Sequence, residues 1–165
     1  IKKFFSNARS NPENQARTLH SLNLILDYFI KNGLMKKRPF SIGVAEAIAY
    51  KGPFLAMRDL SGSTMVRSDK LPTVFREEVH RAMLDFGRLI SLSENRMQTV
   101  FANAGLLYPT PDFIPSNIIC HVKNGRFDRA WIIDQFHDPK AVDPRLRRES
   151  VSRIWSKWSM GQKRK

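Results

Sequence analysis

The sequence predicts an all-α fold, with a single compact domain of about six to eight helices. Apolar residues recur at spacings of three and four along most of the chain, which is the period of an amphipathic helix. Asparagine, glycine and proline stand where these periodic runs begin and end. No turn signal lies between two runs of alternating apolar and polar residues, as a hairpin would require. We expect residues 1–165 to form one helical domain, and to be a fragment because the chain begins at Ile1.

The first helix is expected to start at Asn11-Pro12, since asparagine caps a helix and proline suits its first turn. Asn32-Gly33 is expected to end it, because glycine takes the left-handed conformation of a helix cap at no steric cost. Its core stripe consists of Leu19, Leu22, Ile25, Leu26, Phe29 and Ile30.

The middle of the chain is expected to add several shorter helices. A helix over Ser41–Tyr50 is followed by a break at Gly52-Pro53 and by one or two turns over Phe54–Leu60. After a polar loop over 61–70, Pro72 opens a helix. Ser91 and Glu94 match a capping box, which predicts the start of another helix that ends at Gly105. The stripe of the helix after Pro72 consists of Phe75, Val79, Met83, Phe86 and Ile90.

The C-terminal third is expected to begin with a surface loop over 106–115, because this stretch holds three prolines. The apolar runs Ile118–Val122 and Phe127–Phe136 predict helix again, with Asn124-Gly125 either dividing two helices or weakening one. Asp143-Pro144 predicts the start of a last helix, and residues 160–165 a frayed basic tail. The apolar residues of that last helix are Leu146, Val151, Ile154, Trp155 and Trp158.

The sequence holds no constellation that predicts catalysis, a metal or a cofactor, and we expect no enzyme. The histidines are scattered, and neither a HExxH nor a CxxC motif occurs. Cys120 and His121 are neighbours, so on a helix they would point about 100° apart, which suits no nucleophile and base. We therefore expect Cys120 to be a small core residue. A single cysteine also fits a reducing compartment.

The formal net charge of +13 favours an acidic partner, either a protein surface or nucleic acid. Basic residues gather near the C-terminus, where Trp155 and Trp158 interleave with them. Such a mixture could bind single-stranded nucleic acid, with rings stacked on bases, or it could be the solvated face of a helix whose tryptophans are buried. The candidate contacts are Arg145, Arg147, Arg148, Arg153, Lys157, Lys163, Arg164 and Lys165.

Short segments between residues 38 and 130 together resemble the core of the non-structural protein NSs of phleboviruses. They stand in the order EAIAY, GPFLAMRDLSG, RM, AGLLYPTPDF and HVKNGRF. The most distinctive of them joins an aromatic residue, a turn with glycine and proline, and a short apolar run. In this chain those positions are Tyr50, Gly52, Pro53 and, at the end of the run, Asp59.

The resemblance implies a non-enzymatic viral virulence factor that acts inside the infected cell, in the host cytoplasm or nucleus. Such proteins antagonise innate immunity by binding host proteins of interferon induction, transcription or translational stress control, sometimes with self-association. Partner choice differs between these viruses, so the resemblance names no single host target. The alternative from the charge pattern is a basic helical RNA-binding or nucleoprotein-like module.

Overall fold

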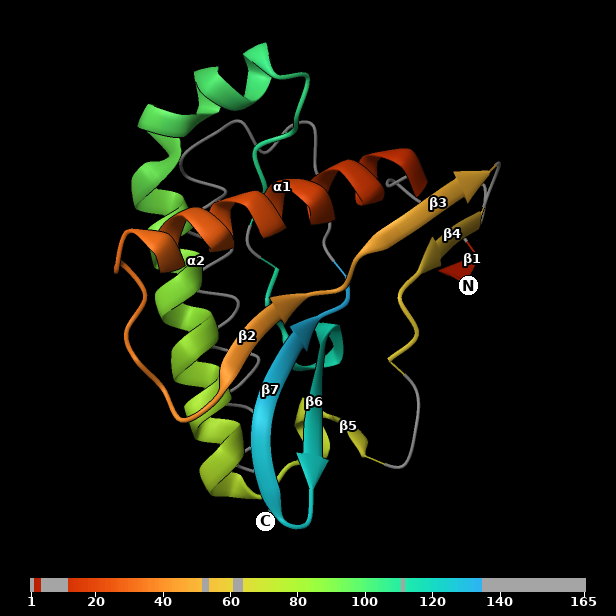
Figure 1. The fold of residues 1–165 in the computed structure, drawn as a ribbon, viewed down its shortest axis with the longest axis vertical. Coiled ribbons are helices and arrows are strands. Elements are labelled where there is room, and N and C mark those ends of the chain that lie inside the picture. Colours follow the sequence, from red (N-terminus) through yellow and green to blue (C-terminus); the bar gives the residue numbers. More distant parts are fainter. Residues whose placement is uncertain (1, 4–11, 52–53, 61–63, 111, 135–165) are drawn as a thin grey trace.

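The computed structural model describes residues 2–3, 12–51, 54–60, 64–110 and 112–134, and within them the chain is mixed α/β (Figure 1). The prediction of an all-α fold is therefore wrong. The helices are α1 (Pro12–Lys31), α2 (Thr73–Asn103) and the 3-10 turns η1 (Ser68–Lys70) and η2 (Pro115–Asn117). The strands are β1 (Lys2–Lys3), β2 (Ser41–Val44), β3 (Ala47–Lys51), β4 (Phe54–Met57), β5 (Met65–Arg67), β6 (Ile118–Lys123) and β7 (Arg126–Ile132).

The strands form two sheets. The larger sheet has the order β2-β7-β6-β5, in which β2 runs parallel to β7 and the other neighbours are antiparallel. The smaller sheet has the order β1-β4-β3 and is antiparallel. Strands β2 and β3 follow each other closely along the chain, so this edge passes from the larger sheet directly into the smaller one (Figure 1).

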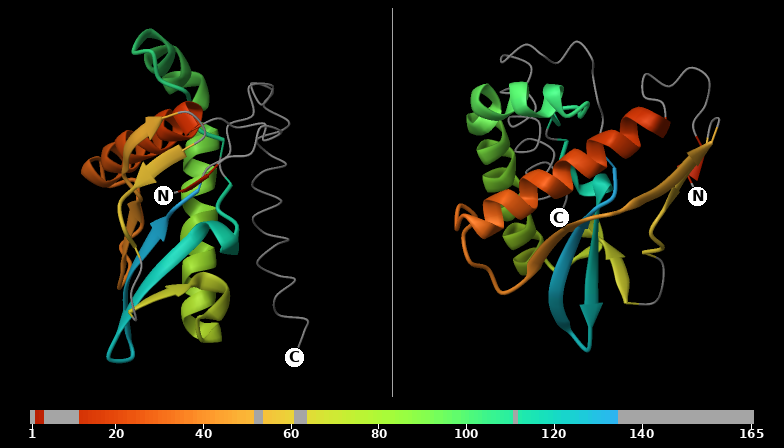
Figure 2. Two further views of the ribbon diagram at one scale, coloured as in Figure 1. Left: turned by 90° about the vertical axis from the view of Figure 1, so that its right-hand side faces the viewer. Right: turned by 45° about the horizontal axis from the view of Figure 1, so that its top comes forward.

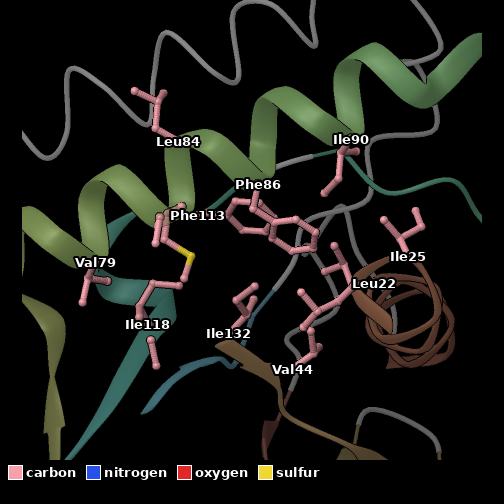
Figure 3. Packing of buried hydrophobic residues seen from close by; sticks show 14 of the residues in the cluster. Leu22, Ile25, Val44, Val79, Leu84, Phe86, Ile90, Phe113, Ile118 and Ile132 are labelled. Carbon is pink, nitrogen blue, oxygen red and sulfur yellow. The ribbon is translucent and has the colours of Figure 1, made fainter. Parts of the chain in front are cut away.

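The hydrophobic core lies between the two helices and one face of the larger sheet. Figure 2 shows α2 along that face, with α1 crossing near its middle. On the sheet side, Ile118 pairs with Ile132 and Cys120 with Ala130, and all four are fully buried. Figure 3 shows helix and sheet side chains converging there. The main helix contributions are Leu19, Leu22, Ile25, Phe29, Val79, Met83, Phe86 and Ile90.

Both glycine helix ends are confirmed. Gly33 and Gly105 have φ of 67° and 68°, the left-handed region that glycine adopts most readily. At the end of α1, the Leu34 amide donates to the Phe29 carbonyl at 2.9 Å, and Gly33 donates to Ile30 at 3.1 Å. This pair of bonds is the Schellman motif, which satisfies carbonyls that the helix itself leaves without donors.

The predicted helix start at Ser91 is wrong, because α2 continues through it. The Ser91 hydroxyl donates to the Gly87 carbonyl, one turn earlier in the same helix, at 3.0 Å. Because the hydroxyl is bonded within the helix, it does not accept a bond from the backbone N–H groups of a new helix start. The opening at Pro72 is confirmed to within a residue, since Pro72 is the N-cap of α2.

The helices predicted over Ser41–Tyr50 and Phe54–Leu60 are strands β2, β3 and β4. The partners of β2 lie far along the chain, with Ser41 opposite Arg129 and Val44 opposite Ile132. The alanine-rich strand β3 pairs with the neighbouring β4 instead. In both cases strand pairing outweighs the local helical tendency, because strand preference depends strongly on context.

The predicted helices over 118–122 and 127–136 are wrong as far as they are described, because β6 and β7 form a hairpin. Asn124 and Gly125 have φ of 52° and 70°, as a tight hairpin turn requires at both central positions. The pairing register shifts between His121 and Val122. A bulge of this kind breaks the alternation of apolar and polar residues, which is why the flanks of Asn124-Gly125 do not look like strands.

The loop over 106–115 is confirmed as non-helical up to η2, but it does not lie wholly on the surface. Phe113 is fully buried and stacks on Phe86 with ring centroids 5.1 Å apart (Figure 3). Tyr108 is 6% exposed, and its hydroxyl donates to the Ile90 carbonyl at 2.6 Å. The loop therefore covers one end of the core, and these two aromatic side chains fasten it to α2.

Candidate functional site: a basic cleft beside α2

A cleft of about 420 Å³ lies between α2 and the segment that joins α1 to β2. Its walls are strongly basic, with five cationic and two anionic side chains. The segment contributes Lys36, Lys37, Arg38, Pro39 and Phe40, and α2 contributes Glu78, Arg81, Leu84, Asp85 and Arg88. We call this feature the basic cleft.

The joining segment is held in place by its ends. The Schellman motif at Gly33 stops α1 and redirects the chain. Phe40 is 7% exposed, and its ring lies 4.5 Å from that of Phe127, which in turn lies 5.8 Å from Phe75 at the start of α2. This aromatic cluster ties the segment to both β7 and α2, so the cations before Phe40 lie alongside the helix.

An ion pair crosses the basic cleft. The Arg38 guanidinium lies 2.6 Å from the Asp85 carboxylate, and the Lys36 ammonium lies 3.4 Å from the same oxygen. The Arg38 side chain is 16% exposed, so its pairing is well shielded, whereas Lys36 is 76% exposed and its contact contributes little to stability. Asp85 therefore fixes the position of Arg38 and leaves the other cations of the cleft to face solvent.

The exposed face of α2 continues the basic character beyond the cleft. Arg81 and Arg88 are exposed and seven residues apart, so they lie on one face, about 10 Å apart along the axis. Leu92 and Arg96 follow at intervals of four on the same face, and Leu92 is 80% exposed. Leu92 therefore adds an exposed apolar side chain to a face that is otherwise basic.

A second group of polar side chains surrounds the tip of the β6–β7 hairpin. His121 Nδ1 lies 2.6 Å from a carboxylate oxygen of Asp128, and both line a shallow hollow. Lys123 and Arg126 line the same hollow, and Arg129 stands opposite His121 in the sheet. The group is basic, although the Asp128 carboxylate partly offsets its charge.

Two of the four residues predicted as a family-like motif are described, and they lie toward opposite ends of the β3–β4 pair. Tyr50 lies on β3 and is half exposed, close to the end of the strand that leads to β4. Asp59 is exposed beyond the opposite end of β4. Gly52 and Pro53 lie outside the described residues.

The predicted basic contacts near the C-terminus also lie outside the described residues, as do the tryptophans among them and the expected frayed tail. The predicted basic contacts are Arg145, Arg147, Arg148, Arg153, Lys157, Lys163, Arg164 and Lys165.

The expectation that Cys120 is a core residue is confirmed. Its side chain is fully buried on the inner face of β6, and burial raises the pKa of the thiol to about 12. His121 follows on the strand and lies on the outer face, so the two side chains point to opposite sides of the sheet rather than about 100° apart on a helix. Burial also lowers the pKa of His80 on α2, with a smaller contribution from Arg81.

Among the described residues, no group of three or more histidine, cysteine, aspartate or glutamate side chains is placed to hold a metal ion. The described helices include none with the length and apolar character needed to cross a membrane. Comparison of the chain with protein-family models, with curated proteins and with solved structures finds no match in any of the three.

No residue of the basic cleft is among the site residues predicted from the sequence. Lys36, Lys37 and Arg38 are visible as a run of cations after a helix end. The signal for the opposite wall is the heptad spacing of Arg81 and Arg88 on a continuous helix. The predicted helix start at Ser91 conceals that this face continues to Leu92.

Proposed function

We propose that the protein is a non-enzymatic viral virulence factor that antagonises host innate immunity by binding host proteins. The resemblance to phlebovirus NSs supports this class of function, which includes interference with interferon induction, transcription or translational stress control. The basic cleft and the face of α2 that continues it form the binding surface. Under this proposal the protein acts in the cytoplasm or nucleus of the infected cell.

The observation that carries the proposal is the exposed Leu92 between Arg88 and Arg96, next to a cleft with an excess of cations. Arginine is enriched at protein–protein interfaces, and the exposed leucine beside it is apolar area that a partner can bury. Charges around it accelerate the encounter with an acidic partner and select against basic ones.

The test is a pull-down from human cell lysate after nuclease treatment, at about 0.3 M salt so that weak electrostatic contacts are screened. Wild-type protein is compared with Arg81→Glu combined with Arg88→Glu. The control, Lys51→Glu with Arg67→Glu, makes the same charge change at exposed sites away from the cleft. We expect a discrete host complex with wild type and control, and its loss with the cleft variant. A complex that all three recover equally would contradict this binding surface.

A second function, RNA binding, is favoured by the net charge of +13 and by the cations at the β6–β7 hairpin. It predicts that affinity for a single-stranded RNA falls linearly with the logarithm of salt concentration, since bound counterions are released. Charge reversal at Arg147, Arg148 and Arg153 should abolish the binding without unfolding the protein. If host complexes are recovered from untreated lysate but not from nuclease-treated lysate, RNA binding replaces host-protein binding as the proposed function.

A further inference from the structure

We infer that the basic cleft binds an acidic segment of a partner protein, one that carries an apolar side chain beside its carboxylates. The inference rests on the proposed function and specifies the chemistry of the partner. Three features support the inference. They are the spacing of the solvent-exposed cations, the carboxylates between those cations, and the exposed Leu92.

The cations that face solvent are spaced along the cleft rather than gathered at one point. Arg38 is paired with Asp85 at 2.6 Å, whereas the cations exposed to solvent, and so able to meet an anion, are Lys36, Lys37, Arg81 and Arg88. Arg81 and Arg88 stand about 10 Å apart along the axis of α2. Carboxylates at heptad spacing on an acidic helix repeat over the same distance, and each can form a charge-assisted pair with one arginine.

The carboxylates of the cleft disfavour a nucleic-acid strand. Glu78 and Asp85 alternate along α2 with Arg81 and Arg88. Within a duplex each strand carries roughly one negative charge every 3.4 Å of helix axis. Some phosphates would therefore lie against Glu78, whereas Asp85 is already paired with Arg38. An acidic protein segment avoids this repulsion, because polar or apolar residues can stand opposite Glu78 and Asp85 while its carboxylates meet the arginines.

Leu92 supplies the apolar part of the recognition. It lies one turn beyond Arg88 on the same face and is 80% exposed. An apolar side chain of the partner would bury this leucine, a gain that a sugar-phosphate backbone does not provide. The partner segment that fits this surface therefore carries acidic and apolar residues together on one face.

The cleft is also organised before any partner arrives. Phe40 packs on Phe127, and Arg38 is paired with Asp85, so the joining segment and α2 keep their separation. A preformed surface loses little conformational entropy on binding, which favours a short segment as ligand.

The experiment uses the full chain and a short fluorescein-labelled helical peptide with glutamates at heptad spacing and leucines on the same face. Fluorescence anisotropy is compared with two control peptides, one with glutamine for glutamate and one with serine for leucine. We expect each control peptide to bind at least about tenfold more weakly, since one charge-assisted pair or one buried leucine has about that effect. A single-stranded RNA of equal net charge should bind more weakly than the acidic peptide and should not displace it.

Protein variants locate the site. Arg81→Glu with Arg88→Glu should reduce peptide affinity more than tenfold, and Leu92→Ser should reduce it while circular dichroism remains unchanged. Lys51→Glu with Arg67→Glu should bind as wild type does. Equal affinity for the glutamate and glutamine peptides, or displacement by RNA, would overturn the inference.

The peptide and lysate experiments fail independently. If the cleft variants lose host complexes but wild type does not bind the acidic peptide, the proposed function stands and the inferred partner chemistry is wrong. If the peptide binds through the cleft but the variants keep all host complexes, the inference about ligand chemistry holds and the proposed role of the cleft in host binding fails.

Discussion

Trp131 shows how single residues shape the outer face of the larger sheet. Its ring is 9% exposed, and the guanidinium carbons of Arg58 and Arg129 each lie 5.1 Å from the ring centroid. Both arginines are within the range of cation–π attraction. Beneath the ring lies Gly43, the neighbour of Trp131 on β2. The position is glycine because a Cβ there would lie only 2.7 Å from two ring carbons.

Gly43→Ala should therefore destabilise the protein, by about 1–3 kcal/mol, because the ring must move to admit the new methyl group. Urea denaturation measures the effect. In a Trp131→Leu background, where the ring is absent, the same substitution should cost clearly less. Equal costs in the two backgrounds would mean that the contact between Gly43 and Trp131 does not limit the packing.

Cys120 predicts a specific dependence of stability on pH. Burial disfavours the thiolate and raises the pKa of the folded thiol from its ordinary value of 9.0 to about 12. Its contribution is complete below pH 9.0 and is lost as pH rises toward 12, by about 1.4 kcal/mol per pH unit.

Cys120→Ala should remove this alkaline loss, although the smaller side chain lowers stability at neutral pH. Free energies of unfolding from urea titrations at about pH 8 and about pH 10.5 measure the slope. Parallel curves for wild type and variant would show that the folded thiol ionises as freely as the unfolded one.

At the scale of elements, the β6–β7 hairpin depends on its two turn residues. Gly125 has φ of 70°, and an added Cβ would meet nothing within 4 Å, so any penalty of substitution comes from the backbone. Gly125→Ala should cost about 1 kcal/mol, and Gly125→Asn should cost less because asparagine tolerates the left-handed region better. The urea midpoints of the three proteins give the order. An alanine variant as stable as wild type would contradict the turn geometry.

The outer ends of the two helices were predictable because their signals are local, although the break predicted at Ser91 was wrong. Pro12 with Gly33, and Pro72 with Gly105, mark the boundaries of α1 and α2 closely. The strands were not, because the apolar face of β2 is completed by β7, 88 residues away in the pair of Ser41 and Arg129. In β7, the bulge at Asp128 removed the alternation that could have supported the Asn124-Gly125 signal.

Only one wall of the basic cleft leaves a local signal in the sequence. A run of three cations is visible in any sequence, but its opposite wall needs to be placed by packing. The cleft forms only when Phe40 contacts Phe127 and Arg38 pairs with Asp85, which lies 47 residues later in the chain. No local spacing encodes either contact.

At the scale of the whole molecule, the net charge of +13 predicts how stability responds to salt. Self-repulsion of like charges destabilises the compact state, and salt screens it. The thermal midpoint should rise as sodium chloride increases from about 10 mM to about 150 mM, where the screening length falls from about 30 Å to about 8 Å. A falling midpoint would show that ion pairs such as that of Arg38 and Asp85 outweigh the repulsion.

The parallel pairing of β2 with β7 has a consequence for synthesis on the ribosome. A growing chain releases Ser41–Val44 long before Arg126–Ile132 is made, so β2 waits through the synthesis of α2 with an open edge. During that interval the edge can join a strand of another nascent chain. The late arrival of β7 makes closure of this sheet slow compared with the formation of either helix. Chaperone demand and yield at high expression should therefore depend on how long the last strand is delayed.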